Sequence, residues 1–497
     1  MADYLHGAYG QIQAVGTRVA GQSQSAIVYV GTAPVHTLEG GNKKVNVPIV
    51  VESIAEARAQ FGYSDDWASY TLCEAMHAHL EQKGVGPLIL INVLDPDTHT
   101  ATTGGTGSIT PSGGKLTIPS AQSIVLDSVV IKTTDSTPVT KVKGTDYTIA
   151  YNPDKKTIVA TELTAGALGS AALDVTWDII DVSKVTSSVV IGSTDDLGSN
   201  TGLYAIRNVY QLTGYIPAFL AAPGFSSVPA VHAVMVQVAQ KINTHWDAYC
   251  FVDLPISDSG TPLTLTTAVT WKSTNHYDSP NETVYFPMAV GTDKKKYHLS
   301  VLAAANFQEL LLEQDGIPYR TASNTDCEII QNLYLGDANI GKVYDDSLIN
   351  EKLNKNGICS AAYVGGRWAI WGCHSADYNQ TDKTQINVSE TSRMMLFYIS
   401  NDFQHRRPKN VDKPMTANDL KTIVAEEQTR LDALVKIGAL IYGQVTLNAR
   451  AADASDVMYD DFSFLFNVTT TPLARSLTAI VNWTDEGFVT WFENLTV

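Results

Sequence analysis

Among the residues that could act as an acid or a base, Asp253 is the best placed. It closes the apolar segment "AYCFVD", which predicts a buried strand. Enzymes with parallel sheets place catalytic groups at the carboxyl ends of such strands. No second carboxylate or base accompanies Asp253 in the sequence, so helix capping or turn formation is the favoured interpretation. An α/β enzyme that uses Asp253 stays an alternative.

Two pairs of residues suggest metal binding or nucleophilic catalysis. His77 and His79 lie two residues apart on a predicted helix, so their side chains point to different faces, whereas a metal pair on a helix needs a spacing of three or four. Cys373 and His374 are adjacent, so their side chains diverge and are badly placed for a nucleophile–base dyad. We interpret all four residues as structural.

Two further segments look functional by composition only. Residues 104–116, "GGTGSITPSGGKL", lack the glycine spacing of a phosphate loop, and Leu116 replaces the hydroxyl residue that would hold magnesium. We interpret this segment as a flexible linker and the Lys294–Lys296 run as a solvated loop. The sequence therefore predicts no catalytic residue, no metal and no cofactor.

The composition narrows the classes of partner. The 497 residues include 34 Lys and Arg against 51 Asp and Glu, a net charge of −17, which argues against binding to nucleic acid or anionic membranes. The five cysteines are scattered and favour neither a disulfide framework nor a zinc site. We expect neither a signal peptide nor a membrane span, because the required apolar stretches are missing.

The elements that must position these residues alternate between strands and helices. This rhythm predicts a mostly parallel sheet with helices on both faces. Ser53 and Glu56 predict a capped helix that ends at Gly62, and Thr416 and Asp419 predict the start of the strongest helix. Further helices are predicted over 71–84 and 298–315. Short apolar runs, among them 187–193, are predicted as strands.

The predicted fold is multi-domain, of the α/β and α+β classes. Composition changes abruptly near residue 97, where Thr, Ser, Gly and Val dominate and helical periodicity is lost, and it changes back near 188. We predict a discontinuous α/β core interrupted by an all-β domain and followed by an α+β domain with terminal arms. The predicted parts are an N-terminal arm (1–20), the α/β core (21–96 and 188–345), the inserted β-domain (97–187), the α+β domain (346–475) and a C-terminal β-ribbon (476–497).

The last part raises the question of what covers it. The segment "SLTAIVNWTDEGFVTWFENLTV" predicts strand, turn and strand with no chain left to cover its edges. Bare strand edges invite pairing with another chain, so proteins usually hide them. Either the body of this molecule or a neighbouring molecule must cover the ribbon.

Several segments stand in a recognisable order along the chain, namely "NVPIVVESIAEARAQFG", "YIPAFLAAPGFS", "AYCFVDLP", "NETVYFPMAV", "GIPYRTASN", "LNKNGICSAAYVGGRWAIWG", "INVSETSRMMLFYISND" and "LDALVKIGALIYG". Together they resemble the contractile tail sheath proteins of phages and of related bacteriocin-like particles. The resemblance runs through most of residues 25–497 outside the predicted insert. The pair Ser392-Arg393 departs from the Arg-Arg pair common in this family.

This resemblance implies a structural subunit rather than an enzyme. Subunits would stack as helical rings, usually hexameric, around a tail tube, would contact baseplate and tail terminator proteins, and would contract to drive the tube through a cell envelope. Assembly would take place in the bacterial cytoplasm, and the insert would face outward. Another self-assembling baseplate or surface-array protein stays an alternative. Terminal arms would add strands to neighbouring subunits through Gln11, Ile12, Ala14, Val15, Ile480, Val481, Trp483, Phe488, Val489 and Trp491.

A basic cluster stands out in this acidic chain just before the strongest predicted helix. It consists of His405, Arg406, Arg407 and Lys409. A solvated helix end is the simpler interpretation. The alternative is that Arg406, Arg407 and Lys409 contact an acidic tube surface.

Overall fold

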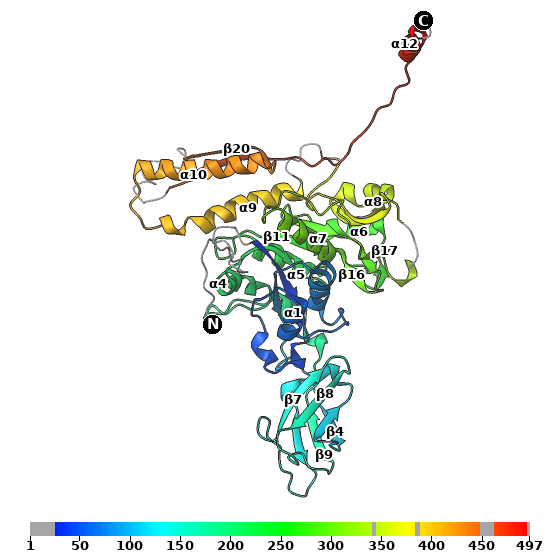
Figure 1. The fold of residues 1–497 in the computed structure, drawn as a ribbon, viewed down its shortest axis with the longest axis vertical. Helices are drawn as coiled ribbons and strands as arrows, with labels where there is room; N and C mark the ends of the chain where they lie inside the picture. The colour runs from blue at the N-terminus through cyan, green and yellow to red at the C-terminus, as the bar shows by residue number, and fades with distance from the viewer. Residues whose placement is uncertain (1–24, 340–343, 383–387, 448–461, 495–497) are drawn as a thin grey trace, which may run out of the picture. The chain divides into compact units, whose positions relative to one another are not determined.

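The computed structural model describes residues 25–339, 344–382, 388–447 and 462–494. The chain divides into two compact units, which we call the body (Met1–Pro414) and the C-terminal unit (Met415–Val497). Figure 1 shows the ribbon coloured along the chain.

The body is built around one eight-stranded sheet, as the strand–helix rhythm predicts. Its order is β19-β18-β14-β11-β10-β1-β3-β2, with parallel pairing throughout the interior and antiparallel pairing of the two edge strands. The strands are β1 (Ser25–Gly31), β2 (Ile49–Val51), β3 (Leu88–Asn92), β10 (Ile216–Ala221), β11 (Tyr249–Asp253), β14 (Glu282–Tyr285), β18 (Ile358–Val364) and β19 (Arg367–Trp371).

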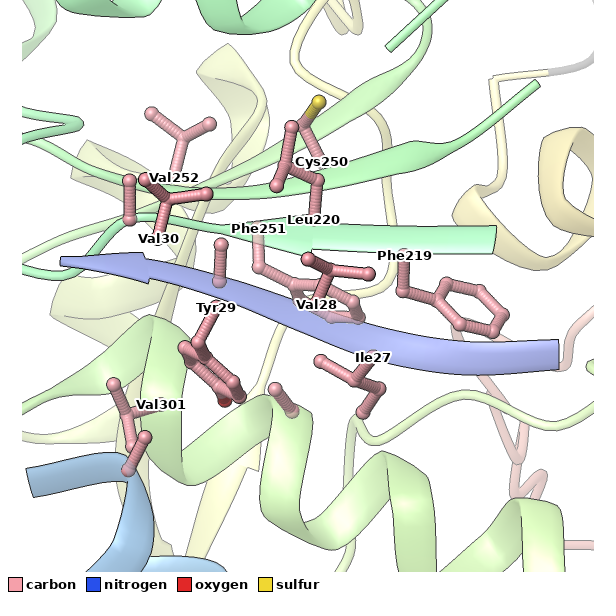
Figure 2. Close-up of a cluster of buried hydrophobic side chains, with 14 of the residues drawn as sticks. Ile27, Val28, Tyr29, Val30, Phe219, Leu220, Cys250, Phe251, Val252 and Val301 are labelled. Atoms are coloured by element: carbon pink, nitrogen blue, oxygen red, sulfur yellow. The ribbon is translucent and has the colours of Figure 1, made fainter. Parts of the chain in front are cut away.

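The interior strands are buried on both faces, which explains why they read as continuous apolar runs. All residues of β3, β10 and β11 are buried. Figure 2 shows apolar side chains of β1, β10 and β11 packed together, with Val301 of a covering helix close by. The body helices are α1 (Ile54–Phe61), α2 (Thr71–Ala75, continued by a π-helical turn Met76–Lys83), α3 (Ser187–Ile191), α4 (Val209–Thr213), α5 (Pro229–Val238), α6 (Leu265–Thr274), α7 (Leu299–Glu313), α8 (Asp346–Lys352) and α9 (Glu390–Arg406).

The predicted helix signals near residue 53 are confirmed. The Ser53 side chain accepts a hydrogen bond from the Glu56 amide, and Gly62 ends α1 with φ of 72°. The Glu56 carboxylate reaches back to the amide of Glu52 rather than to that of Ser53, at 2.9 Å. The helix predicted over 298–315 is present as α7.

The prediction of a strand over 187–193 is wrong. Residues Ser187–Ile191 form α3, which ends at Gly192 with φ of 67°. A short apolar run with a single buried side chain fits a helical turn as well as a strand, so its periodicity does not discriminate. In the structure α3 packs against α5.

The insert has its own architecture and its own core. Two antiparallel three-stranded sheets, β4-β9-β6 and β5-β8-β7, enclose a cluster of buried side chains separate from the main core (Figure 1, cyan). A turn joins two of these strands at Asn152, whose side chain accepts from the Lys155 amide at 3.0 Å. The strands are β4 (Gly105–Ile109), β5 (Lys115–Ile118), β6 (Val130–Thr133), β7 (Tyr147–Asn152), β8 (Thr157–Glu162) and β9 (Leu173–Trp177).

The two chain segments that lead into and out of the insert are hydrogen-bonded to each other. The Ala101 amide donates to the Ile179 carbonyl at 2.7 Å, and the Asp181 amide donates to the His99 carbonyl at 2.7 Å. We call these paired segments, 99–101 and 179–181, the stem. The insert therefore leaves and re-enters the body at adjacent points.

The body extends beyond the predicted boundary at residue 345. Strands β18 and β19 complete the central sheet through the parallel pairing of β14 with β18, and the structure divides at residues 414 and 415 instead. A smaller sheet of β15 (Met288–Gly291), β16 (Lys296–His298) and β17 (Ile330–Tyr334), and a hairpin of β12 (Ser257–Asp258) and β13 (Thr261–Pro262), complete the body strands among the described residues.

Candidate assembly surface

The position at which a sheet of this topology binds ligands is filled by the chain itself. The strand order reverses between β1 and β10, and doubly wound proteins bind ligands beyond the carboxyl ends of the strands at that point. A Cβ on Gly31 would lie 2.3 Å from Thr71 Oγ1, and one on Gly224 would lie 3.0 Å from Thr71 Cγ2. Thr32 Oγ1 donates to the Ser69 carbonyl at 2.8 Å. The start of α2 therefore occupies the crevice.

Asp253 caps a helix, as the favoured interpretation predicts. Its carboxylate accepts from the Ser300 amide at 3.0 Å and from the Ser300 hydroxyl, in the first turn of α7. Burial raises the pKa of Asp253, against the charge of His298 and the Ser300 hydrogen bonds. Asp253 and Ser300 are 3% and 1% exposed, so a substrate does not reach them.

A buried ion pair lies beside this cap. Glu74 of α2 accepts from the His298 amide, and its Oε2 lies 2.7 Å from His298 Nδ1. Burial alone would lower the pKa of His298, but the charge and hydrogen bond of Glu74 and the charge of Asp253 raise that pKa to about 9. The pair ties α2 to the start of α7.

The two histidines of α2 face different partners, as their spacing predicts. His77 Nδ1 lies 2.9 Å from Glu81 Oε2, whereas His79 lies between Tyr29 and Gln308, at 2.7 and 2.6 Å. Burial lowers the pKa of His79 to about 4, against the hydrogen bond that His79 Nδ1 donates to Gln308 Oε1. In the described part of the chain, no cluster of three or more His, Cys, Asp or Glu is arranged to hold a metal.

Cys373 and His374 also have structural surroundings. The Cys373 side chain is buried, and the His374 ring stacks on Tyr378 with centroids 3.7 Å apart. The interpretation of residues 104–116 as a flexible linker is wrong, because most of the segment forms β4 and β5. Their alternating burial against the insert core holds them in the two sheets.

The Lys294–Lys296 run is not simply a solvated loop. Lys294 Nζ donates to Gln331 at 2.6 Å, and Lys296 Nζ donates to the Tyr334 hydroxyl at 2.6 Å. Lys295 pairs with Asp65 and lies over the Trp67 ring, 4.6 Å from its centroid. The turn between β15 and β16 thus directs the three ammonium groups toward neighbouring elements. These contacts are not apparent from the sequence alone.

The basic cluster at the end of α9 is less exposed than a docking patch requires. Arg407 is 8% exposed, and Arg406 forms an ion pair with Asp402 at 3.0 Å, one helical turn earlier. Lys409 follows in the 3-10 turn Pro408–Asn410 and is exposed. Of the three cations expected to contact a tube, Lys409 is therefore the exposed one.

The C-terminal unit is one long helix against a two-stranded ribbon. Helix α10 (Ala417–Lys436) begins with the predicted capping box of Thr416 and Asp419. It runs alongside β20 (Leu440–Leu447), which pairs with β21 (Phe464–Thr470) (Figure 1). Leu431 is buried at the contact, and a Cβ on Gly443 would lie 2.9 Å from Leu431 Cβ. Glycine therefore allows α10 to approach β20 closely.

This ribbon is the part of the C-terminal unit best suited to pairing with another chain. In the described residues, β20 and β21 form a sheet of two strands with no third strand on either side. Apolar side chains remain on its surface, namely Ile441, Tyr442, Leu447 and Leu465. The segment "DDFSFLFNVTTTP" is expected from the sequence to form a strand, and it contains β21. Alternation in "ALIYGQVTL" is the signal in the sequence for its partner β20.

The prediction of a β-ribbon over 476–497 is wrong for the described residues of the single chain. Residues 471–484 have no regular secondary structure, and α12 (Glu486–Glu493) follows. A strand needs a partner for its backbone groups, whereas a helix satisfies them internally, so the unpaired chain favours the helix. Side chains predicted for strand exchange are far from buried: Ile480 is 83% exposed, Val481 89% and Trp483 79%, and Phe488 and Trp491 are exposed as well.

The other predicted arm is not described. Gln11, Ile12, Ala14 and Val15 lie outside the described residues, as does the side chain of Val489. None of the described helices combines the length and the apolar character needed to cross a bilayer.

Two known proteins that resemble this chain in sequence are tail sheath proteins of phages. The chain is 31% identical over 261 residues to the tail sheath protein of Burkholderia phage BcepMu, covering 51% of this chain and 50% of that protein. It is 22% identical over 320 residues to the major tail sheath protein of Serratia phage KSP20, covering 63% of this chain and 76% of that protein. No family model matches the chain. The chain thus spans half the length of the first of these relatives.

The fold is shared with a contractile assembly. A subunit of the PVC sheath complex, an extracellular contractile injection system solved in the contracted state, matches with a TM-score of 0.54 and 9% identity, over 98% of both chains. Both relatives are tail sheath proteins. By sequence the chain is therefore similar to two phage tail sheath proteins, and it shares its fold with a subunit of a contractile sheath.

Proposed function

We propose that this protein is the structural subunit of a contractile tail sheath. Subunits polymerise as stacked helical rings, hexameric in the simplest arrangement, around an inner tube, and contraction drives the tube through the envelope of a target cell. Its partners are further copies of itself, the tail tube protein, and baseplate and terminator proteins. The assembled location is a virion tail or an equivalent extracellular particle, built in the host cytoplasm.

The observation that carries this proposal is that the segment 471–484, which we call the tail, exposes large apolar side chains and follows a sheet of only two described strands, β20 and β21. Large apolar side chains at 477, 480, 481 and 483 are each at least 79% exposed in the isolated chain. Exposed apolar groups on this scale mark an interaction segment. The two-stranded ribbon β20–β21 is the matching surface, because an extended segment adds to a sheet edge by backbone hydrogen bonds.

The length of the tail suits contact with another molecule. The 14 residues from 471 to 484 span up to about 45 Å when extended, at roughly 3.3 Å per residue. A tail that pairs with a neighbour's ribbon makes a head-to-tail contact, and contacts of this kind generate open helical arrays unless the rotation closes a ring. The N-terminal segment with Gln11, Ile12, Ala14 and Val15 is proposed as the second arm.

The strength of such a link is sufficient to outlast rearrangement of the bodies. A strand exchange of about six to ten hydrogen bonds, each contributing about 0.5–1.5 kcal/mol, amounts to several kcal/mol per subunit. Polar contacts between bodies, at about 0–1 kcal/mol for each exposed ion pair, are weaker and are remade more easily. The arms therefore hold subunits together while the bodies slide from the extended to the contracted state.

The contact with the tube is a separate part of the proposal. We place Lys409, with Arg406 and Arg407 behind it, on the wall that faces an acidic tube surface. Lys409 is exposed, and the ion pair of Arg406 with Asp402 fixes the end of α9 next to it.

Electron microscopy of the purified chain, with and without its tail, tests the proposed function. We expect the full chain to form tubes or rings, and the variant that ends at residue 471 to remain a folded, unassembled protein. Circular dichroism and cooperative unfolding of the truncated protein serve as the control. Turnover of a substrate by a monomer, or normal tubes from the truncated chain, would contradict the proposal.

A further inference from the structure

The side chain of Gln428 forms hydrogen bonds with the backbone of β20. From the middle of α10, Gln428 Nε2 donates to the Gly443 carbonyl at 3.0 Å, and Gln428 Oε1 accepts from the Val445 amide at 3.0 Å. Its second N–H is used as well, since Nε2 lies 2.8 Å from Asp432 Oδ1. Every polar group of the Gln428 amide therefore has a protein partner.

These two hydrogen bonds identify the outer edge of β20. A backbone N–H donates one hydrogen bond, so the Val445 amide that points to Gln428 does not take part in the ladder with β21. In an antiparallel pair, alternate residues direct both their N–H and C=O groups toward the partner strand or away from it. Gly443 and Val445 are two residues apart and share a direction, so both face away from β21.

The Gln428 amide takes the place of a peptide unit in a neighbouring strand. In a parallel ladder, one residue of the added strand donates to the carbonyl of residue i−1 and accepts from the amide of residue i+1. Gln428 makes both contacts, with Gln444 as the central residue. A strand from another molecule that pairs along this edge needs the same two backbone groups.

We propose that Gln428 closes the outer edge of β20 in the free subunit and is displaced when a strand of a second copy pairs there. This inference rests on the proposed function, because it concerns the same ribbon. Close packing of α10 against β20 at Gly443 and Leu431 holds Gln428 in reach of the edge. Uncontrolled pairing of an unprotected edge leads to aggregation, and a side chain that occupies the edge opposes it.

Displacement of Gln428 from β20 costs the Gln428 side chain two hydrogen bonds. When a strand arrives, Gln428 loses two backbone partners but keeps Asp432 within reach on its own helix. The incoming strand supplies a donor for the Gly443 carbonyl and an acceptor for the Val445 amide, so neither of these two backbone groups is left unpaired. The exchange conserves hydrogen bonds at the edge, and assembly requires only that the added strand makes more of them than Gln428 does.

Substitution of Gln428 in the full chain tests the proposal. Gln428→Ala and Gln428→Leu remove both hydrogen bonds, and Leu keeps much of the bulk. The matched control is Thr429→Ala on the exposed side of the same helix, where the lost hydroxyl bonds only to the Ala425 carbonyl. Two quantities are measured: hydrogen exchange of the Val445 amide in unassembled protein, and the lowest protein concentration at which tubes appear.

In both Gln428 variants we expect Val445 to exchange at least about tenfold faster and tubes to appear at roughly three- to tenfold lower concentration, as the loss of about one net hydrogen bond allows. Thr429→Ala should behave as wild type in both. Unchanged Val445 exchange, or faster exchange with an unchanged or higher assembly concentration, would overturn the displacement. Absence of tubes from wild type and all variants would instead refute the proposed function, and the displacement with it.

Discussion

The buried pair of Glu74 and His298 makes the stability of the body depend on pH. The side chains are 1% and 18% exposed, and Nδ1 of the histidine lies 2.7 Å from Oε2 of the glutamate. Because the pKa of His298 in the folded protein is about 9, against 6.5 for an ordinary histidine, folding favours the protonated ring. The stabilisation is fully present below pH 6.5 and is lost as the pH rises through 9.

The size of the effect follows from the same two values. Each tenfold change in proton affinity is worth about 1.4 kcal/mol, so raising the pKa from 6.5 to about 9 contributes roughly 3 kcal/mol below pH 6.5. We expect the free energy of unfolding to fall by up to this amount between pH 6.5 and 9.5. His298→Gln keeps a side chain able to hydrogen-bond to Glu74 but does not titrate, so its stability should change little over that range.

Urea denaturation at a series of pH values, at protein concentrations below assembly, measures this difference. The comparison with His298→Gln subtracts the other groups that titrate, such as Lys272, whose pKa burial lowers. Glu74→Gln serves as a second variant, because it removes the charge that holds the proton on His298. An equal fall in wild type and in His298→Gln would show that the pair does not set the pH dependence.

Three further predictions concern the insert, the ribbon and the tube. Replacing residues 102–178 by a short Gly/Ser linker should leave a body that unfolds cooperatively and assembles, because the insert has its own core; an aggregated product would contradict this. Gly443→Ala should destabilise the C-terminal unit by about 1–3 kcal/mol in urea titrations, because the new methyl group overlaps Leu431. Adding Leu431→Ala should relieve that overlap, so losses of unfolding free energy that simply add in the double variant would refute this packing argument. Lys409→Glu should leave stability unchanged and weaken loading onto tubes of tail tube protein at low salt; wild-type loading across a salt titration would place this surface away from the tube.

The features predicted well from the sequence depend on neighbours along the chain. Ser53 and Thr416 cap helices through residues three positions later, and the buried strands read as apolar runs because both faces of the sheet are covered. The change in composition near residues 97 and 188 predicts the insert. For Asp253 the sequence favours helix capping or turn formation, because a second catalytic group is not seen near it, and the structure shows a helix cap.

The features missed depend on partners far away in the sequence or in another molecule. Residues 486–493 carry a pattern that fits a strand through alternate Val489 and Trp491 and fits a helix through Phe488, Trp491 and Phe492, so only the presence of a partner strand decides. The contact of Gln428 with β20 spans 15 and 17 residues and has no signature in either segment. Burial of Arg407 is equally invisible in a cluster of charges.

The paired stem of the insert has a consequence for how the body folds. Central strands β3 and β10 are separated by roughly 120 residues, and closing a loop of n residues costs about (3/2)RT ln n. Once residues 99–101 pair with 179–181, the path between the two strands shortens to about 40 residues. This shortening lowers the entropic cost of closing the sheet by about 1 kcal/mol, equivalent to roughly a fivefold faster search. An insert that folds first during synthesis thus acts as a clamp that brings the late strands of the sheet to the early ones.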